Sequence, residues 1–179
     1  VADTITVNSG NVGIGTDSPA RTLEVYSSAP AIKLNNGTNA FTIGTGAFVD
    51  GSNSLVFFDE GVGERMRLDS SGNVGIGVVP EAWYTPLSTT VLQLGGTTSL
   101  WALSNGSTDL RTNLDNNLYV SNGGSNVYLN TGPASRYQQV NGTHRFNTAT
   151  SGTADATATV TERMRINSSG TLLHGKTTT

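Results

Sequence analysis

The chain has 179 residues, of which 35% are hydrophobic and only 13% are charged, and its formal net charge is −3. So small a charge argues against a disordered chain, and the scattered basic residues exclude a nucleic-acid-binding patch. There is no cysteine to form a disulfide, two histidines cannot supply a transition-metal cluster, and no apolar run could span a membrane, so we expect no cofactor, no metal and no membrane insertion.

Apolar residues alternate with polar ones in short runs and do not recur with a helical period. Such alternation is typical of half-buried strands. We therefore predict an all-β fold, a meander of short strands and β-hairpins with almost no helix. A chain so rich in small polar residues builds only a thin core. Since disulfides and metals are excluded, we expect oligomerisation to supply the missing stability.

Three stretches share one pattern: an alternating run, a polar turn containing glycine, and a second alternating run. They are 4–15, 64–77 and 162–175. The pattern predicts a β-hairpin at each place. In the middle copy, pairing of Met66 with Ile76 and of Leu68 with Val74 puts four apolar side chains on one face, and we interpret these four as candidates for a seam between subunits.

The arginines of the middle copy fall on the other face of the predicted hairpin. Arg67 lies opposite Gly75, which offers no Cβ to block the arginine stem. Glu64 and Glu162 both precede Arg-Met-Arg, which predicts a structural pairing of Glu with Arg across strands or subunits. In the third copy Leu173 and His174 replace the middle copy's Gly and Ile, so either the face opens there or the register shifts by one.

Between the first and second copies we expect strands at 22–26, 31–34, 40–43 and 54–59, with Asn36-Gly37 as a hairpin turn. The continuously apolar run 54–59 predicts a strand buried on both faces. Residues 78–86, with two prolines around adjacent aromatic residues, are the expected boundary.

Beyond this boundary short strand candidates recur at the spacing of a meander. They are 91–94, 99–103, 109–111, 117–120, 126–129, 136–140 and 143–146, separated by turns at Asn105-Gly106, 122–124 and Asn141-Gly142. Residues 148–161 are expected to be extended and weakly packed. The domains are therefore predicted as a shaft-like region (1–79), a β-rich head or knob (80–161) and a C-terminal hairpin (162–179).

The three hairpin stretches resemble the recurring hairpins of bacteriophage tail fibre and tailspike proteins. In addition, Pro133–Tyr137, Asn141–Phe146 and Ser151–Ala154 are similar to a module that lies just upstream of the endosialidase-type intramolecular chaperone domain in such fibres. The chaperone segment expected after Thr179 is absent, so its self-cleaving serine is not assigned here.

The resemblance implies a homotrimeric fibre, intertwined or side by side, with a β-helical or β-prism-like architecture. It implies contacts with other tail and virion proteins and with a glycan or protein receptor on the host cell. It also implies a location in the virion, extracellular after release, following assembly in the host cytoplasm.

No set of residues in the sequence predicts catalysis, and we expect no enzyme. Glycoside cleavage needs two carboxylates roughly 5–10 Å apart across the sugar. Asp59, Glu60, Glu64 and Asp69 are close in sequence, but solvated or ion-paired roles suit them better. His144 is expected to be a packed or surface strand residue, because two histidines without an elbow motif do not make a triad.

Binding is expected to involve aromatic residues of the second half of the chain. Aromatic faces with polar neighbours are typical of sugar and receptor sites, although the same side chains also fill a core. The ligand-binding candidates are Trp83, Tyr84, Trp101, Tyr119, Tyr128 and Tyr137. Among them Trp83 and Tyr84, between two prolines, are expected to be the most exposed.

The leading hypothesis is a non-enzymatic structural component of a phage tail fibre that mediates attachment to the host surface. One alternative is a tailspike-type polysaccharide depolymerase with a carboxylate site between subunits. Another is the stalk of a bacterial surface adhesin.

Overall fold

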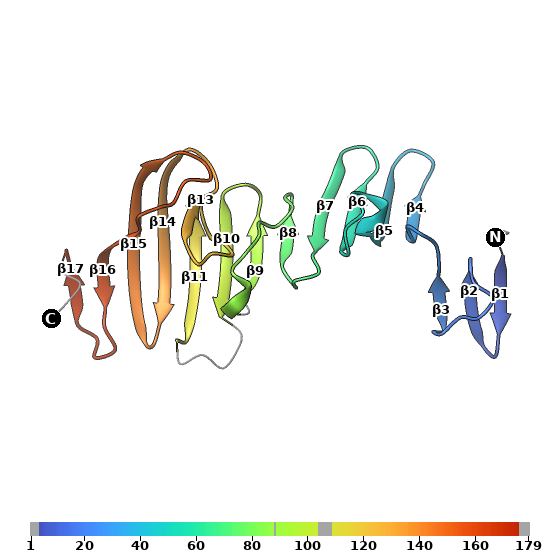
Figure 1. Cartoon of the computed structure of the whole chain (residues 1–179), viewed down its shortest axis with the longest axis horizontal. Coiled ribbons are helices and arrows are strands. Elements are labelled where there is room, and N and C mark those ends of the chain that lie inside the picture. The colour runs from blue at the N-terminus through green and yellow to red at the C-terminus, as the bar shows by residue number, and fades with distance from the viewer. Residues whose placement is uncertain (1–3, 88, 104–108, 176–179) are drawn as a thin grey trace. The chain divides into compact units, whose positions relative to one another are not determined.

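The computed structural model of the chain describes residues 4–87, 89–103 and 109–175 (Figure 1). The part that it describes holds seventeen strands and two 3-10 helices of three residues each, so the expectation of an all-β fold is confirmed. None of its helices is long and apolar enough to cross a membrane. The expected turn at Asn105-Gly106 lies outside the described residues.

The chain divides into two compact units, Val1–Ser70 and Ser71–Thr179. This division precedes the boundary expected near residue 79. It also separates the two strands of the middle hairpin copy, so each of these strands is described within its own unit.

The first unit contains two sheets. In one, β1 (Ile5–Asn8) pairs antiparallel with β2 (Asn11–Ile14), which pairs parallel with β3 (Leu23–Val25). In the other, neighbouring strands pair antiparallel in chain order, and a 3-10 helix (Gly46–Phe48) follows the second of them. These strands are β4 (Ala31–Asn35), β5 (Ala40–Thr45), β6 (Leu55–Asp59) and β7 (Gly63–Leu68).

The second unit is built on one sheet with the order β8-β9-β10-β11-β14-β15-β16-β17. The β8–β9 pair is parallel and the other pairs are antiparallel. The strands are β8 (Val74–Ile76), β9 (Thr89–Leu94), β10 (Thr98–Leu103), β11 (Arg111–Asn116), β14 (Gly132–Val140), β15 (Thr143–Gly152), β16 (Thr161–Ile166) and β17 (Leu172–His174).

A separate hairpin between β11 and β14 consists of β12 (Leu118–Val120) and β13 (Asn126–Tyr128), as predicted. Asn117, whose φ of 59° turns the chain out of β11, anchors this hairpin. Its side-chain nitrogen donates to the carbonyl oxygens of Asn130 and Pro133, while its side-chain oxygen accepts from the Asn130 amide. A 3-10 helix (Thr85–Leu87) precedes β9.

The first and third hairpin copies form the predicted hairpins. In the first, Ile5 pairs with Ile14, and Ser9 and Gly10 at the turn both have positive φ. In the third, Met164 pairs with His174 and Arg165 with Leu173. Of the two alternatives for this copy, a register shift is therefore wrong, and Leu173 stands opposite the arginine.

The glycine at the centre of the second strand has a steric role in the first two copies. A Cβ built on Gly13 would lie 2.5 Å from the carbonyl oxygen of Thr16, and one built on Gly75 would lie 2.2 Å from that of Val78. The chain folds back over both glycines three residues later. The backbone of the same unit thus fills the space above Gly75. This close approach explains the glycine better than the expected room for an arginine side chain does.

One packing expectation is wrong and another holds in part. Residues 54–59 are not buried on both faces, because Val56 is fully buried whereas Leu55 on the other face is 42% exposed. Most of residues 148–161 are exposed, as expected of a weakly packed segment, but Ala149 and Ala158 are buried in a cluster with the aromatic ring of Tyr128. Small side chains let the segment approach that ring closely enough to close the core.

We predict that Gly75→Ala destabilises the second unit. The new Cβ would overlap a backbone oxygen, which cannot move as a flexible side chain does, so we expect a loss of about 1–3 kcal/mol in the free energy of unfolding. Urea denaturation at fixed protein concentration measures it. Gly96→Ala is the matched control, because the nearest atom to its Cβ is 3.7 Å away. Equal stability of the two variants would contradict the assigned role.

Candidate functional site

One face of the second unit's sheet carries a continuous row of apolar and aromatic side chains. Each member pairs with the next across neighbouring strands. From β8 to β17 the row consists of Val74, Leu92, Leu100, Leu114, Tyr137, Phe146, Met164 and His174. At about 4.8 Å per strand it is roughly 34 Å long. We call it the apolar row.

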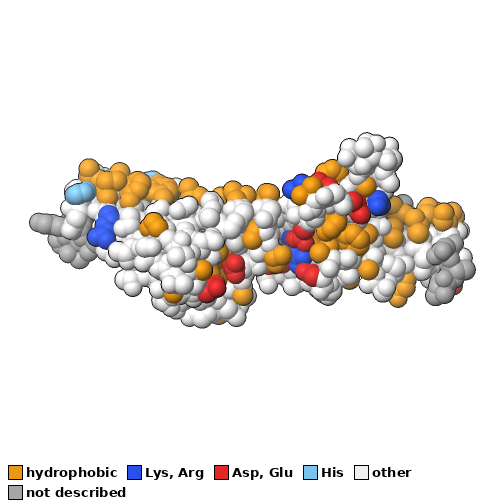
Figure 2. Space-filling view, turned by 90° about the horizontal axis from the view of Figure 1, so that it is seen from above, with side chains coloured by type: hydrophobic (Ala, Val, Ile, Leu, Met, Phe, Trp, Pro, Cys, Tyr) orange, Lys and Arg blue, Asp and Glu red, His pale blue; other side chains and the backbone are white. Residues whose placement is uncertain are grey.

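The described residues of the second unit leave much of the apolar row exposed. Leu100 is 44% exposed, Leu114 50% and Phe146 39%. Figure 2 shows hydrophobic side chains gathered along the upper border of the C-terminal part of the chain. A groove of about 390 Å³ runs beside Val74, Leu92 and Leu100. Monomeric proteins rarely expose so continuous an apolar surface.

The first unit shows the same arrangement on its own sheets. Ile32, Ile43, Phe57 and Met66 pair in succession from β4 to β7, and none of the four is buried. Ile5, Ile14 and Val25 form a similar row on the small sheet. The seam candidates Met66, Leu68, Val74 and Ile76 all remain exposed or half-buried, and their role in a subunit contact stays a prediction.

The opposite face of the second unit's sheet is closed by the unit's own aromatic residues. Trp83 packs 6.0 Å from the ring of Trp101 and 5.9 Å from that of Tyr119, beside Val91. Tyr128 belongs to the other core cluster and donates from its hydroxyl to the carbonyl oxygen of Thr150. These four candidates are therefore core residues of a single chain.

The expectation that Trp83 is the most exposed candidate is wrong, because only 2% of its surface is accessible. It pairs with Ser121 through an isolated bridge, and its indole N–H donates to Oε1 of Gln93. The irregular proline-flanked segment thus folds across the sheet. Tyr84 is half-buried, and Tyr137 lies in the apolar row, where its ring stacks on His144 and its hydroxyl contacts the Nδ1 atom of that histidine.

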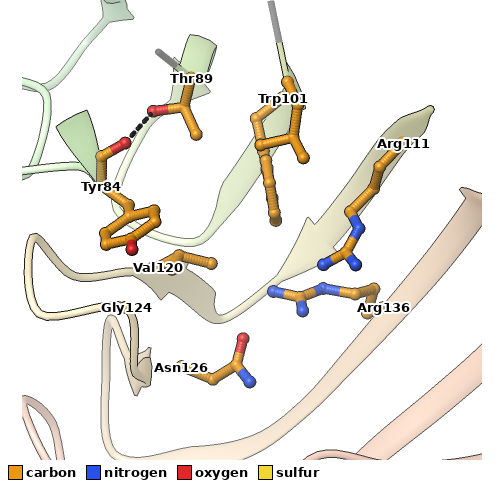
Figure 3. Close-up of a pocket in the computed structure, with 9 residues that line it drawn as sticks. Tyr84, Thr89, Trp101, Arg111, Val120, Gly124, Asn126 and Arg136 are labelled. Atoms are coloured by element: carbon orange, nitrogen blue, oxygen red, sulfur yellow. Dashed lines mark hydrogen bonds between the residues drawn. The ribbon is translucent and has the colours of Figure 1, made fainter. Parts of the chain in front are cut away.

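A pocket of about 300 Å³ lies on the aromatic side of the sheet (Figure 3). We call it the arginine pocket. Its floor comes from β9, β10, β11 and β14, and its roof from the β12–β13 hairpin. Its lining consists of Tyr84, Thr89, Trp101, Leu103, Arg111, Val120, Gly124, Asn126 and Arg136. It therefore includes two of the six predicted aromatic candidates, Tyr84 and Trp101.

A buried ion pair fixes one wall of the arginine pocket. Arg136 donates from Nε and Nη2 to the two carboxylate oxygens of Asp115, both at 2.7 Å, and Asp115 is 1% exposed. The indole N–H of Trp101 donates to the same carboxylate at 2.9 Å, and the Arg136 guanidinium lies 5.3 Å from the Trp101 ring centre. Sequence reasoning missed Arg136 and Asp115. Arg136 begins a predicted strand, whereas Asp115 lies between the predicted strands 109–111 and 117–120, in the part of β11 that was not expected.

The Glu-Arg-Met-Arg segments form clamps within one strand. Phe57 pairs with Met66 and Phe58 with Glu64, which leaves Arg65 as the extra residue of a bulge. The bulge brings Glu64 and Arg67 to the same face. Their two hydrogen bonds are 2.8 and 2.6 Å long.

The third copy contains the same device. Arg163 is the extra residue, and Arg165 donates twice to Glu162 at 2.7 Å. The predicted Glu–Arg pairing is confirmed. Its shortest contacts lie within one strand because of the bulge, and in the third copy Glu162 also contacts Arg145 of the neighbouring strand β15 at 3.7 Å. Arg67 is 3% exposed and also contacts Asp50 at 2.7 Å, which suits a structural role.

Three carboxylates of the first unit, Asp50, Asp59 and Glu60, have depressed pKa values. Hydrogen bonds from Ser52, and then the Arg67 guanidinium, lower the pKa of Asp50 to about 2. A backbone hydrogen bond lowers the pKa of Asp59, and the Thr42 hydroxyl lowers that of Glu60. A general acid for glycoside cleavage needs the opposite shift. In the second unit, burial and then the charge of Asp155 raise the pKa of Glu81.

Among the described residues no three carboxylates or histidines cluster to hold a metal ion. Comparison of the sequence with models of known protein families finds no match, and comparison with curated proteins finds no relative.

We predict that Arg67→Gln costs about 3 kcal/mol of unfolding free energy, because it leaves Glu64 without its buried partner. Thermal or urea unfolding measures the loss. Arg65→Gln, two residues away, is the control: its ion pair with Asp59 is exposed and is expected to contribute less than about 1 kcal/mol. Similar losses for both variants would contradict the clamp.

Proposed function

We propose that the chain is a structural segment of a phage tail fibre, which assembles as a homotrimer through its apolar rows and serves in attachment to the host cell. The observation that carries the proposal is the apolar row. Every member lies at a strand position that alternation directs to the same side of the sheet, and the residues that the structure describes do not cover it.

A second copy of the chain is the occupant that best fits this surface. The rows on both units consist of aliphatic, aromatic and methionine side chains almost without charge, which suits a like surface better than a charged or hydrated ligand. Burial of Leu100, Leu114 and Phe146 would add about 25 cal/mol for each Å² removed from water. The number three comes from the resemblance of the hairpin stretches to phage fibres.

The attachment role rests on the same resemblance and on the difference between the two faces of the second unit's sheet. In the second unit, contact through the apolar row would leave the aromatic side of the sheet and the β12–β13 hairpin outward. A surface that points outward and takes no part in the contact between copies is free to recognise a cell-surface glycan or protein.

The depolymerase alternative has one observation in its favour. Glu81 is the carboxylate whose raised pKa would suit a general acid, and Asp155 is close enough to influence it. The expected position between subunits has no support in the first-unit carboxylates, since Asp59 and Glu60 hold ion pairs with Arg65 and Lys33.

Assembly through the apolar row predicts that Leu100→Asp/Leu114→Asp abolishes trimer formation. A carboxylate buried in an apolar contact without a partner is strongly unfavourable. Sedimentation equilibrium should give three times the chain mass of 18.6 kDa for the native protein and the single chain mass for the variant.

Ser125→Asp, which puts a charge on the exposed tip of the β12–β13 hairpin, should leave the trimer intact. Circular dichroism of the variants checks that the strands persist. A native protein that sediments at the single chain mass would refute the proposal.

Attachment without catalysis predicts that the protein binds at least one polysaccharide from a panel of bacterial surfaces and releases no new reducing ends. Co-precipitation measures binding, and a reducing-sugar assay measures cleavage. New reducing ends that disappear in Glu81→Gln would favour the depolymerase. Absence of binding to every polysaccharide and every whole cell of the panel would contradict the attachment role.

A further inference from the structure

The arginine pocket has a composition that the proposed structural role does not require. Arg111 and Arg136 come from neighbouring strands of the sheet, and Figure 3 shows their guanidinium groups side by side in the pocket. Each guanidinium has one carboxylate partner, Asp115 for Arg136 and Asp109 for Arg111. An anionic group that lies between the two guanidinium groups would be attracted by both, and more strongly in a partly enclosed space than in open water.

The two arginines differ in how firmly they are held. Arg136 uses Nε and Nη2 for Asp115, which leaves the N–H groups of Nη1 outside that pair. Arg111 forms an ion pair with Asp109 through Nη2, and about a third of its side chain is exposed. Arg136 is therefore a fixed donor and Arg111 an adjustable one.

The acidic group nearest to Arg136 has no free carboxylate oxygen. Both carboxylate oxygens of Asp115 already accept hydrogen bonds from Arg136 and Trp101. Beside the pocket, Asn113 pairs with Trp101 in the strand register, is fully buried, and has no hydrogen-bond partner for Nδ2 among the described residues. A ligand that brings a carboxylate would add the acceptor that matches a guanidinium best.

The other residues that line the pocket indicate the chemical class of the part of the ligand that does not carry the charge. Tyr84, Val120 and Leu103 offer apolar surface, whereas the amide of Asn126 is directed toward the two arginines in Figure 3. Gly124 has a φ of 79°, and a Cβ there would lie 3.3 Å from the Tyr84 ring, so the roof is shaped around this aromatic side chain. Aromatic surface with polar groups at the edge suits a sugar ring.

We infer that the arginine pocket binds a carboxylated sugar, with its carboxylate between Arg111 and Arg136 and its ring against Tyr84. The inference rests on the proposed attachment function for its biological meaning. The pocket is formed by one chain, on the side of the sheet opposite to Leu100 and Leu114, so assembly through the apolar row leaves it open.

The test uses glucuronate as the probe, glucose as the neutral sugar of the same ring size, and acetate as the carboxylate without a ring. Isothermal titration or ligand-detected NMR on the full chain should show glucuronate binding with a Kd on the order of 1 mM. Glucose and acetate should each bind at least about tenfold more weakly, a difference of about 1.4 kcal/mol.

Arg111→Gln should weaken glucuronate binding at least about tenfold, since it removes the adjustable donor and leaves the buried Arg136–Asp115 pair untouched. Arg163→Gln, an exposed arginine elsewhere in the unit, is the matched control and should bind as the native chain does. No binding of glucuronate, equal binding of glucose or acetate, or an unchanged Arg111→Gln would each overturn the inference.

Sedimentation and polysaccharide binding, measured on the same samples, separate the two proposals. If the native protein forms the trimer and binds polysaccharide but does not bind glucuronate, this inference alone is refuted. Glucuronate binding by a protein that sediments as a single chain would refute the trimer and leave the pocket standing.

Discussion

The structure depends on one constraint, which is that a sheet has two faces and both need to be covered. A chain with so few large apolar residues can cover only one of them. In the second unit the covered face receives Trp83, Trp101 and Tyr119 together with the β12–β13 hairpin. The other face is left with the apolar row. Burial of apolar area is the main driving force of folding and of association. Covering the exposed face with a partner would therefore be the largest stabilising step still open to the chain.

Two small devices keep the faces distinct. The bulge at Arg65, and its counterpart at Arg163, turns a glutamate and the second arginine onto one face, where they close on each other. Gly75 lets the chain fold back directly over the strand. The bulge keeps the charged pair away from the apolar side, and the glycine leaves room for the chain to close the opposite side of the strand.

The sequence pattern correctly predicted the features that depend on residues close together in the chain. Alternation and Asn-Gly turns gave the all-β class, the β4–β5 hairpin and the β12–β13 hairpin. The burial of Trp83 could not be predicted, because it depends on a segment folding across strands that are distant in sequence. The prediction assumed regular alternation and therefore did not expect Glu64 to pair with Arg67 of its own strand. The bulge at Arg65 breaks that alternation and brings the two side chains together. Arg111 and Arg136 meet only once β11 pairs with β14.

The two methionines of the chain, Met66 and Met164, lie on the exposed apolar faces of the two units, and this makes them reporters of the central claim. The most direct test is the rate at which hydrogen peroxide oxidises each of them, read by mass spectrometry in native protein and in protein unfolded in urea. If copies cover these faces, both methionines should react at least about tenfold more slowly in the native protein. Native rates close to the unfolded ones at both positions would show that the faces remain in water, and would contradict the account.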